Sequence, residues 1–250
     1  DKTLNENYRG FRITVEKDQE DWLVKITHSE GDLSEGDLWF DIDRPFPNAN
    51  EVMTASKKWI DDQFSGANTD HPLILFERAR EMYKEHSEDP ELDWLLCEAM
   101  ISADMSLPDG IASKAFILAT EISVIRNEPL FSTFREALSS DGFIASQAIE
   151  PLFKIDFDAE GMDELVDSVL ERESLTAQFL VHFLKRPLDK TSLSIALYIA
   201  RLRTDDVRVQ ILRYLKSHSI ELPLALIPAI DNHAHFSEIE NALSGYQLGE

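Results

Sequence analysis

A six-residue pattern that recurs along the chain constrains the fold more than any other feature. Residues 111–116 read Ile-Ala-Ser-Lys-Ala-Phe, and residues 144–149 read Ile-Ala-Ser-Gln-Ala-Ile. From Gln147, the same spacing of apolar residues recurs around Gln178 and then around Gln210. Similar helices at a period near 32 are typical of stacked repeats, in which each unit buries its apolar face against its neighbours. We therefore expect a helical-repeat array.

Breaks in the apolar periodicity divide residues 71–250 into helices. Each break supplies Pro, Gly or an Asp that caps the following helix, as at Asp141-Gly142 and Arg186-Pro187. The expected helices span 72–85, 90–104, 109–125, 128–139, 142–155, 160–172, 174–186, 190–203 and 205–217, with closing helices over 219–245. The pattern predicts a mainly helical domain over 71–250, built from helix pairs.

The N-terminal segment 1–64 follows a different period. Apolar and polar side chains alternate over 11–16 and again over 22–27, which is the period of half-buried strands. A third short strand is expected at 38–42, followed by a helix that Asn48 or Asn50 caps. We expect a β-β-β-α module over 1–64, a polar linker at 65–70, and an α+β fold overall.

The last helix pair carries the clearest family resemblance. In HEAT repeats a first helix ends in a short turn with Asp, and a second helix opens with Val-Arg; here Asp205 or Asp206 precedes Val207-Arg208. By its period, the resemblance to HEAT repeats covers residues 90–217, and it implies an α-solenoid with a binding groove. A period near 32 also suits tetratricopeptide and ankyrin arrays, whose signature residues the chain lacks.

The N-terminal module shows a second resemblance. Its pattern Tyr-x-Gly-Phe-x-Ile-x-Val is followed by Trp-x-Val-x-Ile and by a helix that ends Trp-Ile-Asp. This order is similar to small sheet domains of the HicB antitoxin kind. The module would add a second contact with the partner, or it would cap the end of the helical array.

Charge is large and unevenly distributed. The formal net charge is -23; residues 85–173 carry 21 acidic and 5 basic side chains, whereas residues 174–218 carry 3 acidic and 8 basic ones. A surface this acidic repels nucleic acid and anionic membranes and attracts basic partners. We therefore expect a basic protein partner rather than nucleic acid.

Two alternatives keep a role related to nucleic acid. The basic segment 185–216 could hold a phosphate backbone, or the acidic segment 85–173 could mimic DNA by presenting carboxylates to a DNA-binding protein. We add His182 to the candidate residues. It occupies a second-helix position, where it would be a packed or groove-lining histidine. The candidate partner-binding residues are Arg201, Arg208, Arg213, Lys216, His182, Asp156, Asp158 and Asp163.

Signals for catalysis, metal or cofactor are weak. Residues 228–236 resemble the metal-binding first strand of amidohydrolases, in which Asp-x-His-x-His ends an apolar strand, but the sequence after His235 is too short for the barrel of that family. We expect a loop there, with a surface metal site at His233 and His235, aided by Glu238, as the alternative. The chain has no glycine-rich phosphate loop and no Gly-x-Ser-x-Gly elbow, and we expect no cofactor.

The cellular setting follows from cysteine and apolar content. Cys97 is the single cysteine and sits in an apolar helical frame, which favours an inert core thiol in a reducing, cytoplasmic setting. No apolar run reaches the length of a membrane span, and the N-terminus has no apolar signal segment. The leading hypothesis is a non-catalytic scaffold or adaptor that binds a protein partner along its groove. Because HEAT-like proteins include bilin lyases, a tetrapyrrole-related or chaperone-like role is the family-based alternative.

Overall fold

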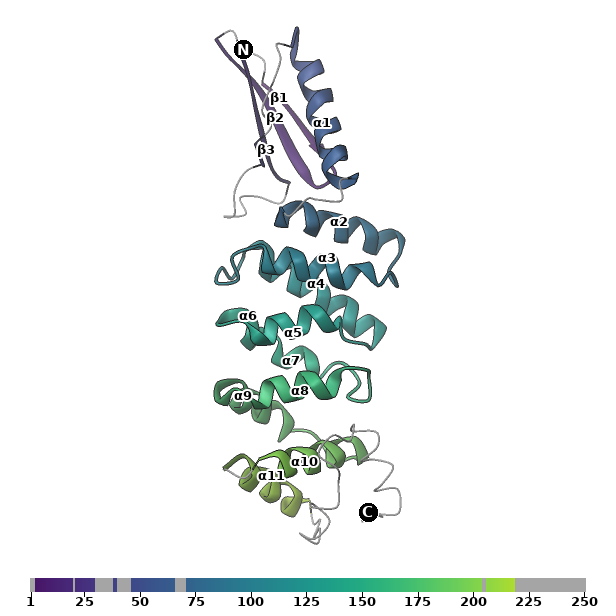
Figure 1. The fold of residues 1–250 in the computed structure, drawn as a ribbon, viewed down its shortest axis with the longest axis vertical. Helices are drawn as coiled ribbons and strands as arrows, with labels where there is room; N and C mark the ends of the chain where they lie inside the picture. Colours follow the sequence, from purple (N-terminus) through teal and green to yellow (C-terminus); the bar gives the residue numbers. More distant parts are fainter. Residues whose placement is uncertain are drawn as a thin grey trace. The chain divides into compact units, whose positions relative to one another are not determined.

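A computed structural model of the chain describes residues 3–19, 21–29, 38–39, 46–65, 71–203 and 206–218 (Figure 1). The fold is α+β, as the sequence predicts: an antiparallel sheet and one helix precede a series of further helices. The chain forms two compact units, the first with residues 1–122 and 140–144 and the second with residues 123–139 and 145–250.

The sheet opens the first unit. Its strands are β1 (Leu4–Tyr8), β2 (Phe11–Asp18), β3 (Asp21–His28) and β4 (Leu38–Trp39), antiparallel and in the order β1-β2-β3-β4. β2 and β3 form where the alternation predicts them. Sequence analysis misses β1, because this strand is mostly polar and largely exposed, so no apolar face marks it. Residues 40–42 of the predicted third strand lie outside the described residues.

Helix α1 (Ala49–Ser65) covers one face of this sheet (Figure 1). Phe11, Ile13 and Ile26 of the sheet are buried, together with Val52 and Ile60 of the helix. These side chains form the core of the module because each strand turns its alternate residues toward α1.

Asn48 caps the start of α1. Asn48 Oδ1 accepts a hydrogen bond from the Glu51 backbone N–H at 3.1 Å, and Asn48 Nδ2 donates to Glu51 Oε1 at 3.1 Å. The structure therefore selects Asn48 over Asn50 as the cap, because its side chain satisfies one of the free N–H groups at the helix start.

The β1–β2 hairpin has a tight turn that meets two helices. Arg9 and Gly10 have φ of 48° and 84°, as the tight turns that match strand twist require. Arg9 Nη1 lies 3.0 Å from Asp61 Oδ1 of α1, and Arg9 Nη2 lies 2.6 Å from Glu81 Oε2 of helix α2 (Pro72–Glu85). The turn thus joins the sheet to α1 and α2; we call it the hairpin tip.

A buried acid of α2 lies against this tip. His28 Nε2 lies 2.5 Å from Glu77 Oε1, and Arg80 Nη1 lies 3.1 Å from the same oxygen. The His28 and Glu77 side chains are only 1% and 5% exposed. A Cβ on Gly10 would clash with Glu77 Oε2, so the missing side chain of Gly10 makes room for the carboxylate.

The remaining helices of the first unit are α3 (Glu91–Ile101) and α4 (Ile111–Arg126), whose last turn belongs to the second unit. α2 begins and ends as predicted. Pro72 occupies its first position, and His71 Nδ1 accepts a hydrogen bond from the Leu73 backbone N–H at 3.3 Å. Within the described residues, no helix combines the length and the apolar character needed to cross a membrane.

The second unit is helical throughout its described part. Its helices are α5 (Phe131–Ser139), α6 (Phe143–Gln147, from Ala145 onward), α7 (Ile149–Leu152), α8 (Met162–Leu170), α9 (Glu173–Phe183), α10 (Lys190–Leu202) and α11 (Asp206–Ser217). The prediction of one helix over 142–155 is wrong, because α6 ends at Gln147 and α7 begins at Ile149. Pro151 explains the break: it lacks an N–H, and its ring clashes with the carbonyl one helical turn earlier, that of Gln147.

Two arginine contacts recur in this unit. Arg172 Nη1, just before α9, donates to Leu138 O near the end of α5 at 2.7 Å. Arg203 Nη1, just after α10, donates to Leu170 O at the end of α8, also at 2.7 Å. Arg172 and Arg203 are about one repeat period apart in the sequence, and so are Leu138 and Leu170. Each arginine satisfies a carbonyl that a helix end leaves without a partner.

Candidate functional site

Acidic residues open the helices α9 and α11, and lysines lie at or just after their C-terminal ends. Glu173 and Asp206 lie in the first turns, whereas Lys185 follows the end of α9 and Lys216 lies in the last turn of α11. Acids near the N-terminus and cations near the C-terminus of a helix complement its dipole. In the sequence the change from acidic to basic falls between residues 173 and 185, and α9 occupies most of this interval, with Glu173 in its first turn and Lys185 after its end.

A groove lies between the acidic ends of these two helices. Its volume is about 770 Å³. The residues that line it are Leu170, Glu171, Glu173, Thr176, Ala177, Leu180, Arg203, Asp206, Val207 and Gln210. We call it the α9–α11 groove. Two smaller hollows, of about 510 and 450 Å³, lie beside Trp22 and Trp59 in the first unit.

The floor of the α9–α11 groove is apolar, and its polar groups bond within the protein. Leu170, Leu180 and Val207 are buried side chains of the lining. The Thr176 hydroxyl donates to Arg172 O at 2.9 Å, while Arg203 bonds to Leu170 O as described above.

The rim of the groove is acidic. Glu171, Glu173 and Asp206 are exposed. No ion pair links any of the three to a cation within the part of the chain that the structure describes. Their carboxylates are therefore available to an outside cation.

Exposed apolar side chains lie on the same helices. Val181 of α9 is 54% exposed, and Val209 of α11 is also exposed. Ile125, in the last turn of α4, is a third example in the second unit. Single exposed apolar residues are common on protein surfaces; Val181 and Val209 lie on the two helices that form the groove but are not among its lining residues.

The opposite ends of the helices carry an aromatic cluster. Ring centroids of Phe153 and Phe179 lie 4.8 Å apart, and those of Phe153 and His182 lie 5.5 Å apart. The Arg186 guanidinium lies 5.4 Å from the Phe157 ring. His182 is therefore half-buried and packed on an aromatic ring, which matches the packed alternative of the sequence analysis.

A tyrosine anchors the end of this cluster. The Tyr214 hydroxyl donates to Arg186 O at 3.1 Å, and its ring centroid lies 5.4 Å from that of Phe183. Burial raises the pKa of the Tyr214 hydroxyl. The hydroxyl therefore stays protonated and serves as a structural donor.

The predicted basic residues fall on two helices. Arg208, Arg213 and Lys216 lie on α11, and the backbone places Arg201 on α10. Arg213 and Lys216 are exposed and stand at i and i+3, so they share one face of α11, whereas Arg208 is half-buried near the acidic end of the helix. These placements give a pair of cations on one face rather than a continuous strip.

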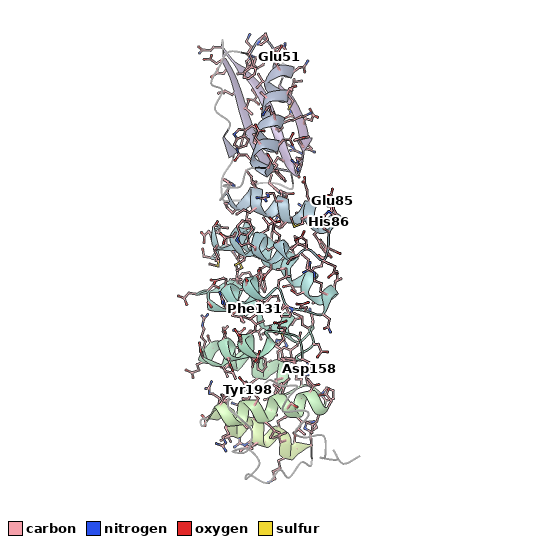
Figure 2. All side chains as sticks on the ribbon, turned by 45° about the vertical axis from the view of Figure 1, so that its right-hand side comes forward. Glu51, Glu85, His86, Phe131, Asp158 and Tyr198 are labelled. Atoms are coloured by element: carbon pink, nitrogen blue, oxygen red, sulfur yellow. The ribbon has the colours of Figure 1, made fainter. Side chains whose placement is uncertain are left out.

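The predicted acidic residues serve local structure. Asp156 Oδ1 accepts a hydrogen bond from the Asp158 backbone N–H at 3.2 Å, in the turn before α8 that Figure 2 labels at Asp158. The Asp156 backbone N–H donates to Asn127 Oδ1 at 2.8 Å. Asp163 lies in the first turn of α8, where a negative charge complements the helix dipole.

Metal and thiol chemistry find little support. Among the described residues, no group of three or more His, Cys, Asp or Glu side chains is placed to hold a metal ion. His233, His235 and Glu238 lie outside the described residues. Cys97 is a buried free cysteine. The pair His28–Glu77 has the residue types of an acid–base dyad, but both side chains are buried from solvent and substrate.

Sequence analysis misses the three rim acids of the groove. Glu171 and Asp206 belong to different helix pairs of the sequence, so no local motif connects them. Only the packing of the helices brings their two segments together. Comparisons with protein-family models, with curated proteins and with solved structures find no significant match. The function of this site is therefore argued from its own geometry.

Proposed function

We propose that this protein is a non-catalytic, cytoplasmic scaffold of HEAT-like helical repeats, and that it binds a protein partner on α9 and α11 of its second unit. The observation that carries the proposal is the α9–α11 groove, together with the exposed apolar side chains Val181 and Val209 elsewhere on the same two helices. The recurring contacts of Arg172 and Arg203 support the repeat assignment, because equivalent residues of successive repeats make equivalent contacts.

A protein partner suits this surface better than a small molecule. Small-molecule sites enclose most of their ligand and are lined mainly by apolar side chains. The α9–α11 groove instead has exposed carboxylates along its rim, so a ligand bound there would remain partly in water. A partner segment that lies across the groove can bury apolar groups on its floor and keep charges at the rim.

Nucleic acid suits the surface less well. A phosphate backbone held by Arg213 and Lys216 would run toward Asp206 at the other end of α11. Because phosphate and carboxylate repel each other, the cation pair lacks the continuous positive track that backbone binding needs.

The test compares two apolar-to-acid variants of matched exposure. Val181 of α9 and Leu23 of β3 are both 54% exposed. Full-length wild type, Val181→Glu and Leu23→Glu serve as baits in native lysate, with quantitative mass spectrometry of the captured proteins. We expect a protein that wild type and Leu23→Glu capture and that Val181→Glu loses. Equal capture by all three baits, or loss with Leu23→Glu alone, contradicts the proposal.

A further inference from the structure

We infer that the α9–α11 groove binds a basic, amphipathic segment of a protein, whose Lys or Arg side chains pair with Glu171, Glu173 and Asp206 while its apolar side chains cover the floor. This inference rests on the proposed function, because it names the chemistry of the partner at the same surface. Three observations carry it: the acidic rim, the apolar residues of the floor and the short side chain of Ala177.

Charge complementarity identifies the sign of the partner. Three exposed carboxylates surround one groove, and Arg203, the one cation among the lining residues that the structure describes, donates to the Leu170 carbonyl. A bound Lys or Arg would meet carboxylates that have no ion-pair partner within the described part of the chain. An acidic segment would meet repulsion from all three.

The floor favours apolar side chains on the partner over a small area only. Leu170, Leu180 and Val207 line the groove and are 7%, 3% and 8% exposed, so covering them adds a small hydrophobic gain to the ion pairs of the rim. Ala177 is exposed at the groove, and its short side chain lets a partner backbone approach α9 closely. A segment with apolar residues on one face and cations on its margins matches both rim and floor.

Helix dipoles favour two of the rim acids and act in both directions on the third. Glu173 and Asp206 lie in the first turns of α9 and α11, where negative charge is favourable. Glu171 occupies the C-terminal cap of α8, where the dipole disfavours a carboxylate, and it also lies two residues before the start of α9, where the dipole favours one. The charge of Glu171 is therefore not fixed by either helix, and its exposed carboxylate is open to a cation of the partner.

Glu171 therefore permits a test that separates binding from folding. Glu171→Lys reverses one charge of the rim, while the dipole of α8 favours the new cation and the dipole of α9 opposes it. Glu128→Lys is the matched control, because Glu128 is exposed, belongs to the same unit and lies just beyond the end of α4. Both variants change the net charge equally.

The experiment uses a displayed library of random peptides, selected on the full-length protein. We expect enriched peptides to combine Lys or Arg with apolar residues at i, i+3 and i+4. Synthetic copies should bind Glu171→Lys about fivefold more weakly than wild type in fluorescence anisotropy, and Glu128→Lys within about twofold. Thermal unfolding should show that Glu171→Lys stays close to wild type in stability, because the dipoles of α8 and α9 act on its charge in opposite directions.

Several results would overturn the inference. These are the absence of enriched basic peptides, equal binding to wild type and Glu171→Lys, or equal weakening by Glu171→Lys and Glu128→Lys. The same variants are used as baits with the native partner. If Val181→Glu loses the partner while Glu171→Lys keeps it, the scaffold function stands and the basic-segment inference fails. If neither variant changes capture, both fail.

Discussion

The hairpin tip of the first unit and the α9–α11 groove of the second both have several carboxylates nearby. The carboxylates at the tip have charged partners within the protein, whereas those at the rim of the groove have none among the described residues. At the tip, Asp61 and Glu81 pair with Arg9, and Glu77 contacts His28 and Arg80. At the groove, the rim acids are exposed and lack ion pairs within the described residues. Charge therefore stabilises the fold in one region and remains available for binding in the other.

This difference has a physical basis. A carboxylate removed from water is costly unless cations and hydrogen bonds replace the water, so the buried acid at the tip has partners. An exposed carboxylate keeps its water and needs no partner, so its position is free to serve a ligand. Substitutions at the tip should consequently change stability, and substitutions at the groove should change binding.

The largest effect is expected from Glu77→Ala. This change leaves the buried His28 without its 2.5 Å partner and opens space against Gly10. Loss of one member of a buried pair costs about 3–5 kcal/mol of unfolding free energy. Urea unfolding followed by circular dichroism measures the loss.

Glu81→Ala provides the comparison within the same helix. Glu81 pairs with Arg9, but its side chain is 35% exposed, so water replaces the lost contact. We expect a cost below about 1 kcal/mol. If Glu81→Ala costs as much as Glu77→Ala, burial does not set the value of these pairs and the contrast between tip and groove is lost.

A second effect at the tip concerns Gly10. Gly10→Ala requires a side chain at φ of 84° and drives its Cβ into Glu77 Oε2. The left-handed backbone alone costs about 1–2 kcal/mol, and the contact adds to it. The expected total is about 2 kcal/mol or more in urea unfolding.

A double variant separates the two contributions to the Gly10 effect. In the Glu77→Ala background, Gly10→Ala should cost less than in the wild type, because the atoms that the new Cβ meets are gone. Equal costs in both backgrounds would show that backbone conformation alone requires glycine at this position.

The sequence predicts elements better than it predicts sites. The bounds of α2 follow from Pro72 and from the polar residues on either side of the helix, and β2 and β3 follow from strict alternation. β1 is missed because a polar edge strand has no apolar face. The split between α6 and α7 is missed because apolar periodicity continues across it, although Pro151 marks the break.

Counts of charged residues over long sequence segments do not predict which residues form the site. Counting charges over long segments assigns Glu171 and Glu173 to an acidic region and Asp206 to a basic one. In the structure the three acids line one groove, because the first turns of α9 and α11 are neighbours there. Local counts average over whole helices, whereas the groove depends on which ends of those helices meet.

The stability of the two units should also respond differently to acid. In the first unit the titrating group is His71. Burial lowers the pKa of His71 below its ordinary value of 6.5, and its Nδ1 caps α2 by accepting from Leu73. The unfolded chain therefore binds the proton more readily, so stability is complete above pH 6.5 and falls as the pH drops toward the lower folded pKa.

His71→Asn tests this contribution. Asparagine also caps helices but does not titrate, so the variant should lose less stability than wild type on acidification. The difference should reach about 0.5–1 kcal/mol, the value of a helix cap, in urea unfolding on either side of the ordinary histidine pKa. Parallel pH profiles of the two proteins would contradict the assignment.

The smallest effect, and the one of opposite sign, is expected at Asp167 in the second unit. Burial raises the pKa of Asp167 above 3.8, nearby acids including Asp163 and Glu171 add to the rise, and the hydrogen bond from Tyr198 opposes it. The Tyr198 hydroxyl, on the residue that Figure 2 labels, donates to Asp167 Oδ1 at 2.5 Å. The folded chain here binds the proton more readily, so this group adds stability as the pH falls from the raised pKa toward 3.8.

Two variants should move this gain in opposite directions. Tyr198→Phe removes the hydroxyl, which should cost about 1 kcal/mol and raise the pKa of Asp167 further, so that the gain begins at higher pH. Glu171→Lys replaces an acid with a cation, so the gain should begin at lower pH. Asp167→Asn should abolish it while its amide oxygen still accepts from Tyr198. Unfolding free energies measured against pH show at which pH the gain begins in each variant. An unchanged profile in Glu171→Lys would show that Glu171 does not influence the pKa of Asp167.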